Sequence, residues 1–388
     1  MFDSIIIRNQ SSYGAPPSID LGFLAEALIF YQQVNIIVQS NTLPELIRGV
    51  GTDALIELLT ENFITIKYLE KRPAIHTREE VHTPLMIFSP DHTLEVVAPK
   101  VFQEVTGKSG RGRRLAKSFQ TLVEPIKFED SMAVELKNYF LSSDINAVLV
   151  ENILNELTPE YSTPQNFNFD ITEQDTGVNI ETNLNFNEIN NFYRKKIPAS
   201  HSTITKAFML GEITYHKEEI KLAAQYSSEI ASTEFYSKLH QIEFENLLNK
   251  VSSTKIEKFQ DHIFEDSRSI QDAINKGTKT FDDLIPVLQR GRKFKEWLKD
   301  KPLDADLLET YFKEVRASTW IDKLPGKSSR WMIATGLGIG IDTLIPGGIG
   351  TATGIAVSAA DNFLLEKIVK GWKPNQFVEG SLKKFIGN

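Results

Sequence analysis

The pattern of apolar and polar positions in the first hundred residues predicts short strands separated by helices. Ser4–Arg8 is predicted to be a strand, Val34–Val38 is a continuous apolar run typical of a strand buried on both faces, and Phe63–Tyr68 is a third strand candidate. Between the first two runs, Asp20 is placed to cap a helix whose apolar residues have helical spacing. The order strand, helix, strand, helix, helix, strand favours a small, mainly parallel sheet covered by helices.

Two hairpins are predicted after this unit. Leu85–Ser89 and Thr93–Val97 are expected to pair around a turn formed by proline and aspartate. Phe167–Thr172 and Val178–Leu184 alternate apolar and polar residues on either side of a loop that contains Gly177, which is a second hairpin signal. These later strands either extend the first sheet or form their own.

Beyond Asn187 the apolar positions recur at helical spacing, so the rest of the chain is expected to be helical. The sequence therefore predicts an α+β protein. Its N-terminal half holds a small mixed, largely parallel sheet with helices, and its C-terminal half is all-helical. The expected domains are residues 1–190, the α/β part, and 191–388, the helical part, which ends in a glycine-rich helical hairpin at 331–371.

The glycine-rich stretch Trp331–Ala360 is the longest apolar segment of the chain, and Asp342 is its one charged residue. Pro346, Gly347 and Gly348 divide it into two halves. Four-residue spacing places small residues on one face of a helix, where two backbones can approach closely. The glycines that repeat at this spacing are Gly336 and Gly340 in the first half, and Gly350 and Gly354 in the second.

The length of each half of this hairpin argues against a simple membrane span. About 15 residues of helix are about 22 Å long at 1.5 Å per residue, whereas a bilayer core of about 30 Å needs about 20 residues. Three alternatives remain open: a hairpin buried in the protein, insertion into a membrane as a re-entrant or triggered segment, and a self-association face.

Composition excludes several kinds of site. The chain of 388 residues has no cysteine, which removes thiolate chemistry, disulfides and cysteine-ligated metals. The net charge of −8 gives no overall attraction to nucleic acid or anionic lipid. The first ten residues lack the pattern of a signal peptide, so a cytoplasmic location is expected, with peripheral membrane association as the alternative. No cofactor and no metal site are predicted.

Charge is distributed unevenly, however. The stretch from Lys100 to Lys127 has seven basic and two acidic residues, and the next stretch, Glu129–Glu188, is strongly acidic. The two stretches either face one another or the basic one contacts a polyanion. Glycines at 107, 110 and 112 would let the backbone approach an anion closely. The predicted anion-binding residues are Lys108, Arg111, Arg113, Arg114 and Lys117.

Other candidate chemistry in this region is weaker. Gly107–Lys108–Ser109 is no P-loop, because the position five residues before the Gly–Lys pair is Phe102 rather than glycine. Asp91, Glu95 and Lys100 carry the residue types of a metal-dependent nuclease, in which carboxylates hold a divalent ion beside a lysine. Their spacing matches no single strand or helix face, so they are loose catalytic candidates.

The leading hypothesis is a non-enzymatic interaction or effector protein, soluble when made. Its glycine-rich hairpin would mediate close packing, self-association or membrane association. The alternative is a nucleic-acid-binding protein or metal-dependent nuclease that uses the basic loop 107–117 and the carboxylates near 91–95. The sequence favours a protein partner or self-association, with a membrane surface as a further partner, over nucleic acid.

Overall fold

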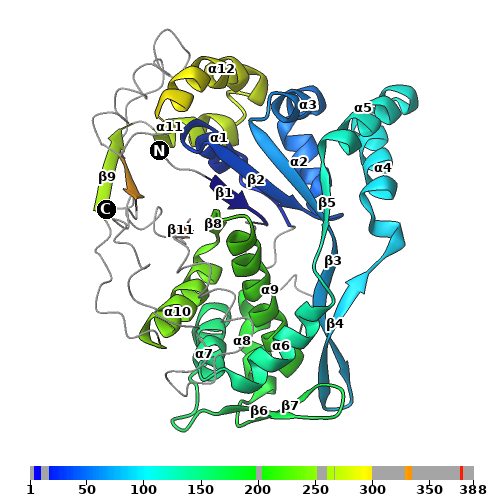
Figure 1. The fold of residues 1–388 in the computed structure, drawn as a ribbon. Helices are drawn as coiled ribbons and strands as arrows, with labels where there is room; N and C mark the ends of the chain where they lie inside the picture. The colour runs from blue at the N-terminus through cyan, green and yellow to red at the C-terminus, as the bar shows by residue number, and fades with distance from the viewer. Residues whose placement is uncertain are drawn as a thin grey trace, which may run out of the picture.

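A mixed sheet lies at the centre of the computed structural model. The structure describes residues 4–9, 17–197, 203–250, 260–265, 267–298, 328–333 and 376–378. Within these residues the sheet has the order β11-β8-β1-β2-β3-β4-β7-β6, and β5 pairs beside β3 (Figure 1). The α+β class predicted from the sequence is confirmed.

The central strands of this sheet are parallel. Strand β1 (Ser4–Ile7) pairs with β2 (Gln33–Val38), and β2 pairs with β3 (Ile64–Arg78). The connections are helical: α1 (Leu21–Phe30) follows β1, and α2 (Leu43–Val50) and α3 (Thr52–Thr60) follow β2. The parallel unit expected from the apolar runs is therefore present. The Asp20 carboxylate caps α1 as predicted, because it accepts from the Phe23 backbone N–H.

Two hydrophobic cores cover opposite faces of the sheet. Consecutive strand residues point to opposite faces, so Ile5 and Ile7 enter one core and Ile6 enters the other. The first core includes α1–α3 together with α4 (Leu94–Thr106), α5 (Ser109–Leu122), α11 (Ser267–Asn275) and α12 (Phe281–Leu298). The second includes α6 (Ser131–Ser142), α7 (Asn146–Leu157), α8 (Phe186–Lys196), α9 (Lys206–Gln225) and α10 (Glu234–Lys250). Figure 1 shows the two groups of helices above and below the sheet.

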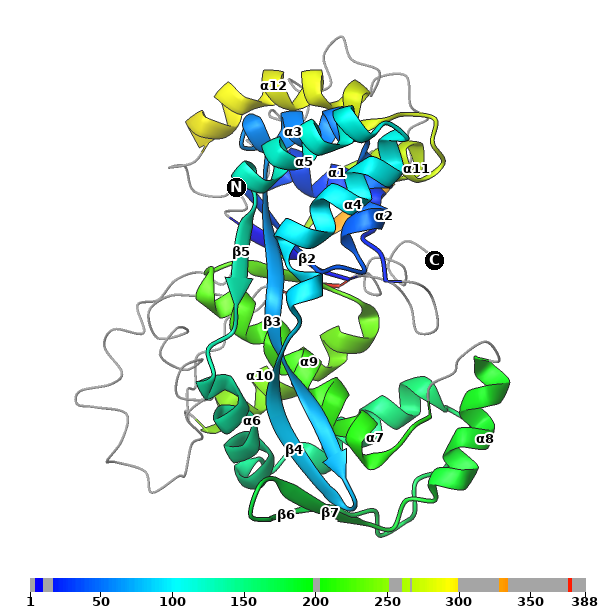
Figure 2. The ribbon, with the colours of Figure 1, turned by 90° about the vertical axis from the view of Figure 1, so that its right-hand side faces the viewer.

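The hairpin predicted around Pro90 is wrong, and the true hairpin lies earlier in the chain. Strand β3 continues to Arg78 and turns back into β4 (Val81–Phe88), so that the pair reaches from one group of helices to the other (Figure 2). The turn uses Glu79 at a φ of +56°, without the glycine or asparagine that usually marks such a turn. The residues after the 3₁₀ turn η1 (Pro90–His92) form α4, because helical spacing of apolar residues from Leu94 onward prevails over alternation.

The second predicted hairpin is confirmed. Strands β6 (Phe169–Glu173) and β7 (Val178–Thr182) pair antiparallel, and β7 contacts β4 through His82 and Val178. A Cβ added at Gly177 would lie 2.4 Å from the His82 carbonyl oxygen, so only glycine fits at this close approach. The hairpin therefore extends the main sheet. Strand β5 (Glu124–Lys127) pairs with residues 67–71 of β3, and the pairing of β3 with β4 begins at Lys71.

The described residues beyond Asn187 are mostly helical, but they include strands, so the prediction that this half is all-helical is wrong. Strand β8 (Glu229–Ser232) pairs parallel with β1, and β11 (Gln376–Val378) pairs with β8. Strands β9 (Gln260–Glu265) and β10 (Ser328–Ile333) form a separate antiparallel pair. The central sheet thus draws strands from both sides of residue 190, and the division into domains 1–190 and 191–388 stays a prediction.

Close packing of α4 on α5 depends on glycine. Gly107 ends α4 at a φ of +61°, a conformation that favours glycine. Gly112 is buried on α5, where an added Cβ would lie 2.7 Å from the Gln103 Cα. Gly110, on the same helix, has open space around it. Two of the three glycines predicted to let the backbone approach an anion, Gly107 and Gly112, therefore have structural roles in the packing of α4 on α5.

We expect Gly112→Ala to destabilise the protein by about 1–3 kcal/mol, since the methyl group forces α4 and α5 apart. Gly110→Ala is the matched control and should be neutral or stabilising by up to about 1 kcal/mol, because alanine favours the helix and meets no atom. Urea unfolding followed by circular dichroism measures both. Equal effects of the two substitutions would contradict the close contact at Gly112.

Candidate functional site

Strand β1 lies where the order of the sheet changes direction. The chain proceeds from β1 to β2 and β3 on one side, whereas β8 and β11 lie on the other side of β1. Helix α1, which leaves β1, belongs to one core, and α9, which precedes β8, belongs to the opposite core. In open α/β sheets, ligands bind outside the carboxyl ends of the strands at such a switch point. The residues at this place are Arg8, directly after β1, and Ser232, the last residue of β8.

A buried ion-pair network lies there. The Arg8 Nη2 donates to Glu218 Oε2 at 2.5 Å, and Arg72 Nε donates to Glu218 Oε1 at 3.2 Å. The guanidinium carbon of Arg8 lies 4.1 Å from the centre of the Tyr215 ring, and that of Arg72 lies 5.9 Å away. Glu218 is fully buried, whereas 36% of the Arg72 side chain is exposed. The charged end of Arg72 therefore belongs to a side chain that reaches solvent, whereas the Arg8 side chain is buried.

Two buried polar atoms of the network lack partners. Arg8 Nη1 and the Tyr215 hydroxyl have no hydrogen-bond partner among the described residues. A buried donor without a partner costs free energy, typically about 1–3 kcal/mol, and more when it is charged. Such atoms in a native protein call for an explanation, and a bound ligand is one.

Glu219 is the group of this network that exchanges a proton near neutral pH. Burial raises the pKa of Glu219 to about 7, although the nearby charge of Arg8 and a hydrogen bond from Ser232 oppose this rise. The Ser232 hydroxyl donates a hydrogen bond to Glu219 Oε2, with 3.1 Å between the two oxygens. A carboxyl group with a pKa shifted by burial and a specific charge partner is typical of a functional site. We name Arg8, Arg72, Tyr215, Glu218, Glu219 and Ser232 the switch-point cluster.

Two buried histidines continue the cluster into the space between α9 and α10. The ring centroids of His216 and His240 are 4.8 Å apart, and both side chains are fully buried. His240 Nε2 lies 3.4 Å from Glu219 Oε2. His216 Nε2 lies 3.6 Å from Glu243 Oε2, and in the described part of the chain none of the four ring nitrogens has a partner at normal hydrogen-bond geometry. Burial lowers the pKa of both rings, which are therefore neutral at pH 7.

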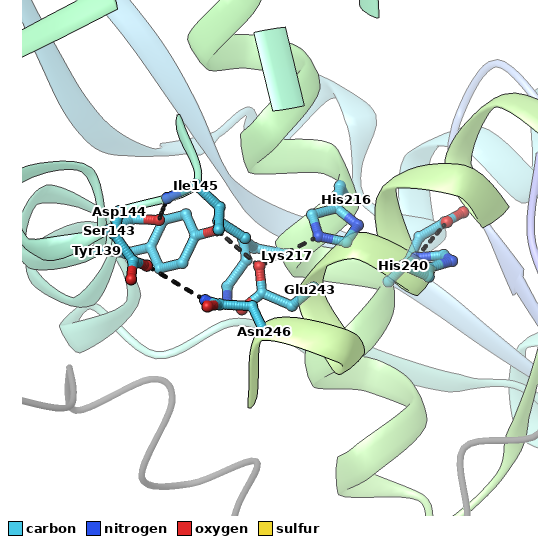
Figure 3. Close-up of polar contacts among 10 residues, drawn as sticks. Tyr139, Ser143, Asp144, Ile145, His216, Lys217, His240, Glu243 and Asn246 are labelled. Atoms are coloured by element: carbon cyan, nitrogen blue, oxygen red, sulfur yellow. Dashed lines mark hydrogen bonds and ion pairs between the residues drawn. The ribbon is translucent and has the colours of Figure 1, made fainter. Parts of the chain in front are cut away.

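The far end of this group is an ion pair that ties three helices together (Figure 3). Glu243 on α10 accepts from Tyr139 Oη of α6 at 2.6 Å and from Lys217 Nζ of α9 at 3.0 Å. Burial opposes ionisation of Glu243, but Lys217 and the other donors outweigh it and hold the pKa well below its usual range. Lys217 Nζ also lies 3.9 Å from the centre of the Tyr139 ring. Both carboxylate oxygens of Glu243 thus have hydrogen-bond donors, so we assign Glu243, Tyr139 and Lys217 a structural role.

The residues predicted as a nuclease site are not brought together with other ligands. Asp91 is exposed in η1, and Glu95 and Lys100 are exposed on α4. Five residues on a helix separate two side chains by about 140° around the axis, so Glu95 and Lys100 do not share a face. Among the residues that the structure describes, no group of three or more His, Asp and Glu side chains is arranged to hold a metal ion.

The predicted anion-binding residues lie on α5 rather than in a loop. Arg111 Nη2 pairs with Asp53 Oδ2 at 2.5 Å, so its charge is partly neutralised. The remaining predicted residues of this set are exposed on or directly before the helix, namely Lys108, Arg113, Arg114 and Lys117. The structure thus separates Arg111 from the other four.

Most of the glycine-rich stretch lies outside the described residues. Trp331–Ile333 belong to β10, so the helix predicted to begin at Trp331 does not begin there. The predicted packing or membrane residues lie outside the described part, namely Gly336, Gly340, Asp342, Gly347, Gly348, Gly350 and Gly354. Within the residues described, no helix has the length and apolar character needed to cross a bilayer.

Sequence reasoning missed the switch-point cluster. Its clearest trace is Arg8, a charged residue directly after the apolar run Ile5–Ile7 of the strand that begins a parallel unit. The run His216–Glu219 gave no signal, because four consecutive polar residues on a helix are usually exposed. No family model, no curated protein and no solved structure matches this chain in the comparisons with known proteins. The chemistry of the residues themselves is therefore the basis for proposing a function.

We expect Glu219→Gln to stabilise the protein at pH 8 and to change it little at pH 5. The folded-state pKa of Glu219, about 7, exceeds the unfolded value of 4.5. The wild-type protein therefore loses stability as the pH rises from 4.5 through 7, by up to about 3 kcal/mol. Glutamine cannot ionise and avoids this loss. Urea unfolding at both pH values measures it.

Glu218→Gln is the matched control for this prediction, because the two glutamates are neighbours and both are buried. It should destabilise the protein by about 3–5 kcal/mol, since Arg8 would stay buried without an ionised partner. If Glu219→Gln were equally destabilising at pH 8, Glu219 would be an ionised structural partner, and the proton exchange assigned to it would be wrong.

Proposed function

We propose that this protein binds a small anionic molecule at the carboxyl ends of β1 and β8, with Arg8 and Arg72 as its anion-binding groups. The observation that carries the proposal is Arg8 Nη1, a buried cationic donor without a hydrogen-bond partner among the described residues, at the switch point of the sheet. A guanidinium presents several N–H donors in a planar fork that matches carboxylate and phosphate oxygens.

The charge of the switch-point cluster supports an anionic ligand. Two guanidinium groups share one carboxylate, that of Glu218. Because the pKa of Glu219 is about 7, this second carboxyl carries only about half a negative charge at neutral pH. The cluster therefore has surplus positive charge. An incoming anion would neutralise it and favour the protonated form of Glu219.

Arg72 gives the best test, because it is partly exposed and its substitution should leave the fold intact. In thermal unfolding with inorganic phosphate, a nucleoside diphosphate or citrate, we expect at least one anion to stabilise the wild-type protein. At 100 times its dissociation constant, a ligand adds about 2.7 kcal/mol. Arg72→Gln should lose most of this effect. Arg78→Gln, an exposed arginine at the end of the same strand, should retain it.

The pH dependence gives a second measure of the same proposal. Between pH 6 and pH 8 the wild-type protein should lose affinity relative to Glu219→Gln, because ionised Glu219 repels the anion. The comparison of the two proteins with the same anion cancels the titration of the anion itself. If none of the three anions stabilises the protein, or if Arg72→Gln responds as the wild type does, the network is a structural ion pair and the proposed site is wrong.

The glycine-rich hairpin carries a separate proposal, which rests on the sequence. We propose that Trp331–Ala360 mediates self-association or membrane association of an effector protein. The glycine spacing supports it, because Gly336 and Gly340 would allow a second helix to approach closely. Gly338 lies midway between them in the sequence, about 200° around a helix, and would therefore face the opposite side.

We expect Gly336→Leu/Gly340→Leu to lose whichever association the wild-type protein displays in size-exclusion chromatography or flotation with liposomes. Bulky side chains would prevent the close approach of the helices. Gly338→Leu, the matched control, should retain the association. A wild-type protein that is monomeric and does not float with liposomes, or equal behaviour of the two variants, would contradict this role of the hairpin.

A further inference from the structure

A row of exposed basic side chains follows one side of α5. Arg113, Arg114 and Lys117 fall within an arc of about 100° on the helix, since they are spaced three and four residues apart. Lys108 directly precedes the helix. We name these four residues the α5 basic stripe. Figure 2 shows α5 on the outside of the upper group of helices, beside α4.

The stripe is not neutralised by the protein itself. All four side chains are exposed, and none forms an ion pair or hydrogen bond with a described residue. The acidic stretch Glu129–Glu188 forms no ion pair with the stripe among the described residues. Four of its carboxylates bind lysines outside α5: Asp130 pairs with Lys71, Glu135 with Lys221, Glu156 with Lys238, and Glu173 with Lys137.

The stripe also lacks local support within its own helix. The first turn of α5 has no acidic residue, and Arg111, the neighbouring cation, uses Asp53 of α3. Lys108, at the N-cap of α5, opposes the helix dipole, which acts within the first turn. A sequence feature that breaks a local rule without compensation is expected at functional sites rather than elsewhere.

We propose that the α5 basic stripe is a contact surface for the phosphate backbone of a double-stranded nucleic acid. A duplex carries one negative charge for about every 1.7 Å of its axis. From Arg113 to Lys117, four residue steps, α5 rises about 6 Å, a length over which a duplex presents about three or four phosphates. A rigid helix therefore holds its cations at a density that suits this polymer.

Other polyanions fit this surface less well. A membrane-binding helix carries exposed apolar residues beside its cations, whereas the large apolar residues of α5 are at least partly buried. Single-stranded nucleic acid is bound by exposed aromatic rings that stack on bases. The aromatic rings of α4 and α5, those of Phe102 and Phe119, are fully buried against one another. The surface offers charge alone, which predicts binding without sequence preference.

The net charge of −8 does not prevent this contact. At 0.1 M salt, the Debye length is about 10 Å, so charges farther away than that are largely screened. A bound duplex is therefore affected mainly by the charges within about 10 Å of the stripe, and little by the net charge of the protein. Affinity should be modest, with a dissociation constant in the range of about 10⁻⁴–10⁻⁶ M that is typical of non-specific binding.

The test measures fluorescence anisotropy of a labelled 20-base-pair duplex between 50 and 200 mM KCl. With four phosphate contacts, the wild-type affinity should fall about 150-fold across this range, a slope of about −3.6 in log K against log salt. Arg113→Gln/Arg114→Gln/Lys117→Gln should bind weakly at 50 mM KCl, with a slope of about −0.9. The substituted residues are exposed, so circular dichroism should be unchanged.

The matched control is Arg194→Gln/Lys195→Gln/Lys276→Gln, which removes the same charge from exposed residues on α8 and next to α11. It should bind the duplex as the wild type does. The proposal is overturned if the wild-type protein does not bind the duplex at 50 mM KCl or if both triple variants lose binding equally. It is also overturned if the stripe binds anionic vesicles or polyglutamate more tightly than the duplex. These results are independent of the anion test on Arg72.

Discussion

The arrangement of the two helical groups depends on the ion pairs of one fully buried carboxylate, that of Glu218. It joins α9 to Arg8 at the end of β1 and to Arg72 on the long strand β3. A buried charge without a partner is costly, so the helix and both strands must keep their positions together. Strand β8 follows α9 closely in the chain and pairs with β1. The ion pair therefore also helps to position the carboxyl end of β8, where Ser232 donates to Glu219.

The parallel unit was predictable because the physical cause is local. Strands β1 and β2 contain the apolar runs Ile5–Ile7 and Ile36–Val38, and Asp20 caps α1 with its own side chain. The hairpin of β3 and β4 was not predictable from turn residues, since Glu79 adopts a positive φ that its side chain does not favour. There the pairing of two long strands outweighs local preference.

The switch-point cluster was beyond reach for a different reason. His216, Lys217, Glu218 and Glu219 are consecutive and all buried, so α9 is surrounded by protein on every side of that turn. From hydropathy alone, such a polar run is expected to be exposed to solvent. The sequence of the run does not indicate that it contacts Arg8, Tyr139 and Glu243. Those partners lie up to 210 residues away in the chain. Only the folded arrangement reveals that the four side chains are paired or enclosed.

The place of β8 in the sheet has a consequence for how the chain is made. Ser4 and Ser228 share a hydrogen bond although 224 residues separate them. At a synthesis rate of about 5–20 residues per second, β1 waits about 11–45 s before β8 emerges from the ribosome. During that interval the edge of Ile5–Ile7 that β8 later covers is open to any other strand. The nascent chain is thus most vulnerable to wrong pairing at its first strand, long after that strand has left the exit tunnel.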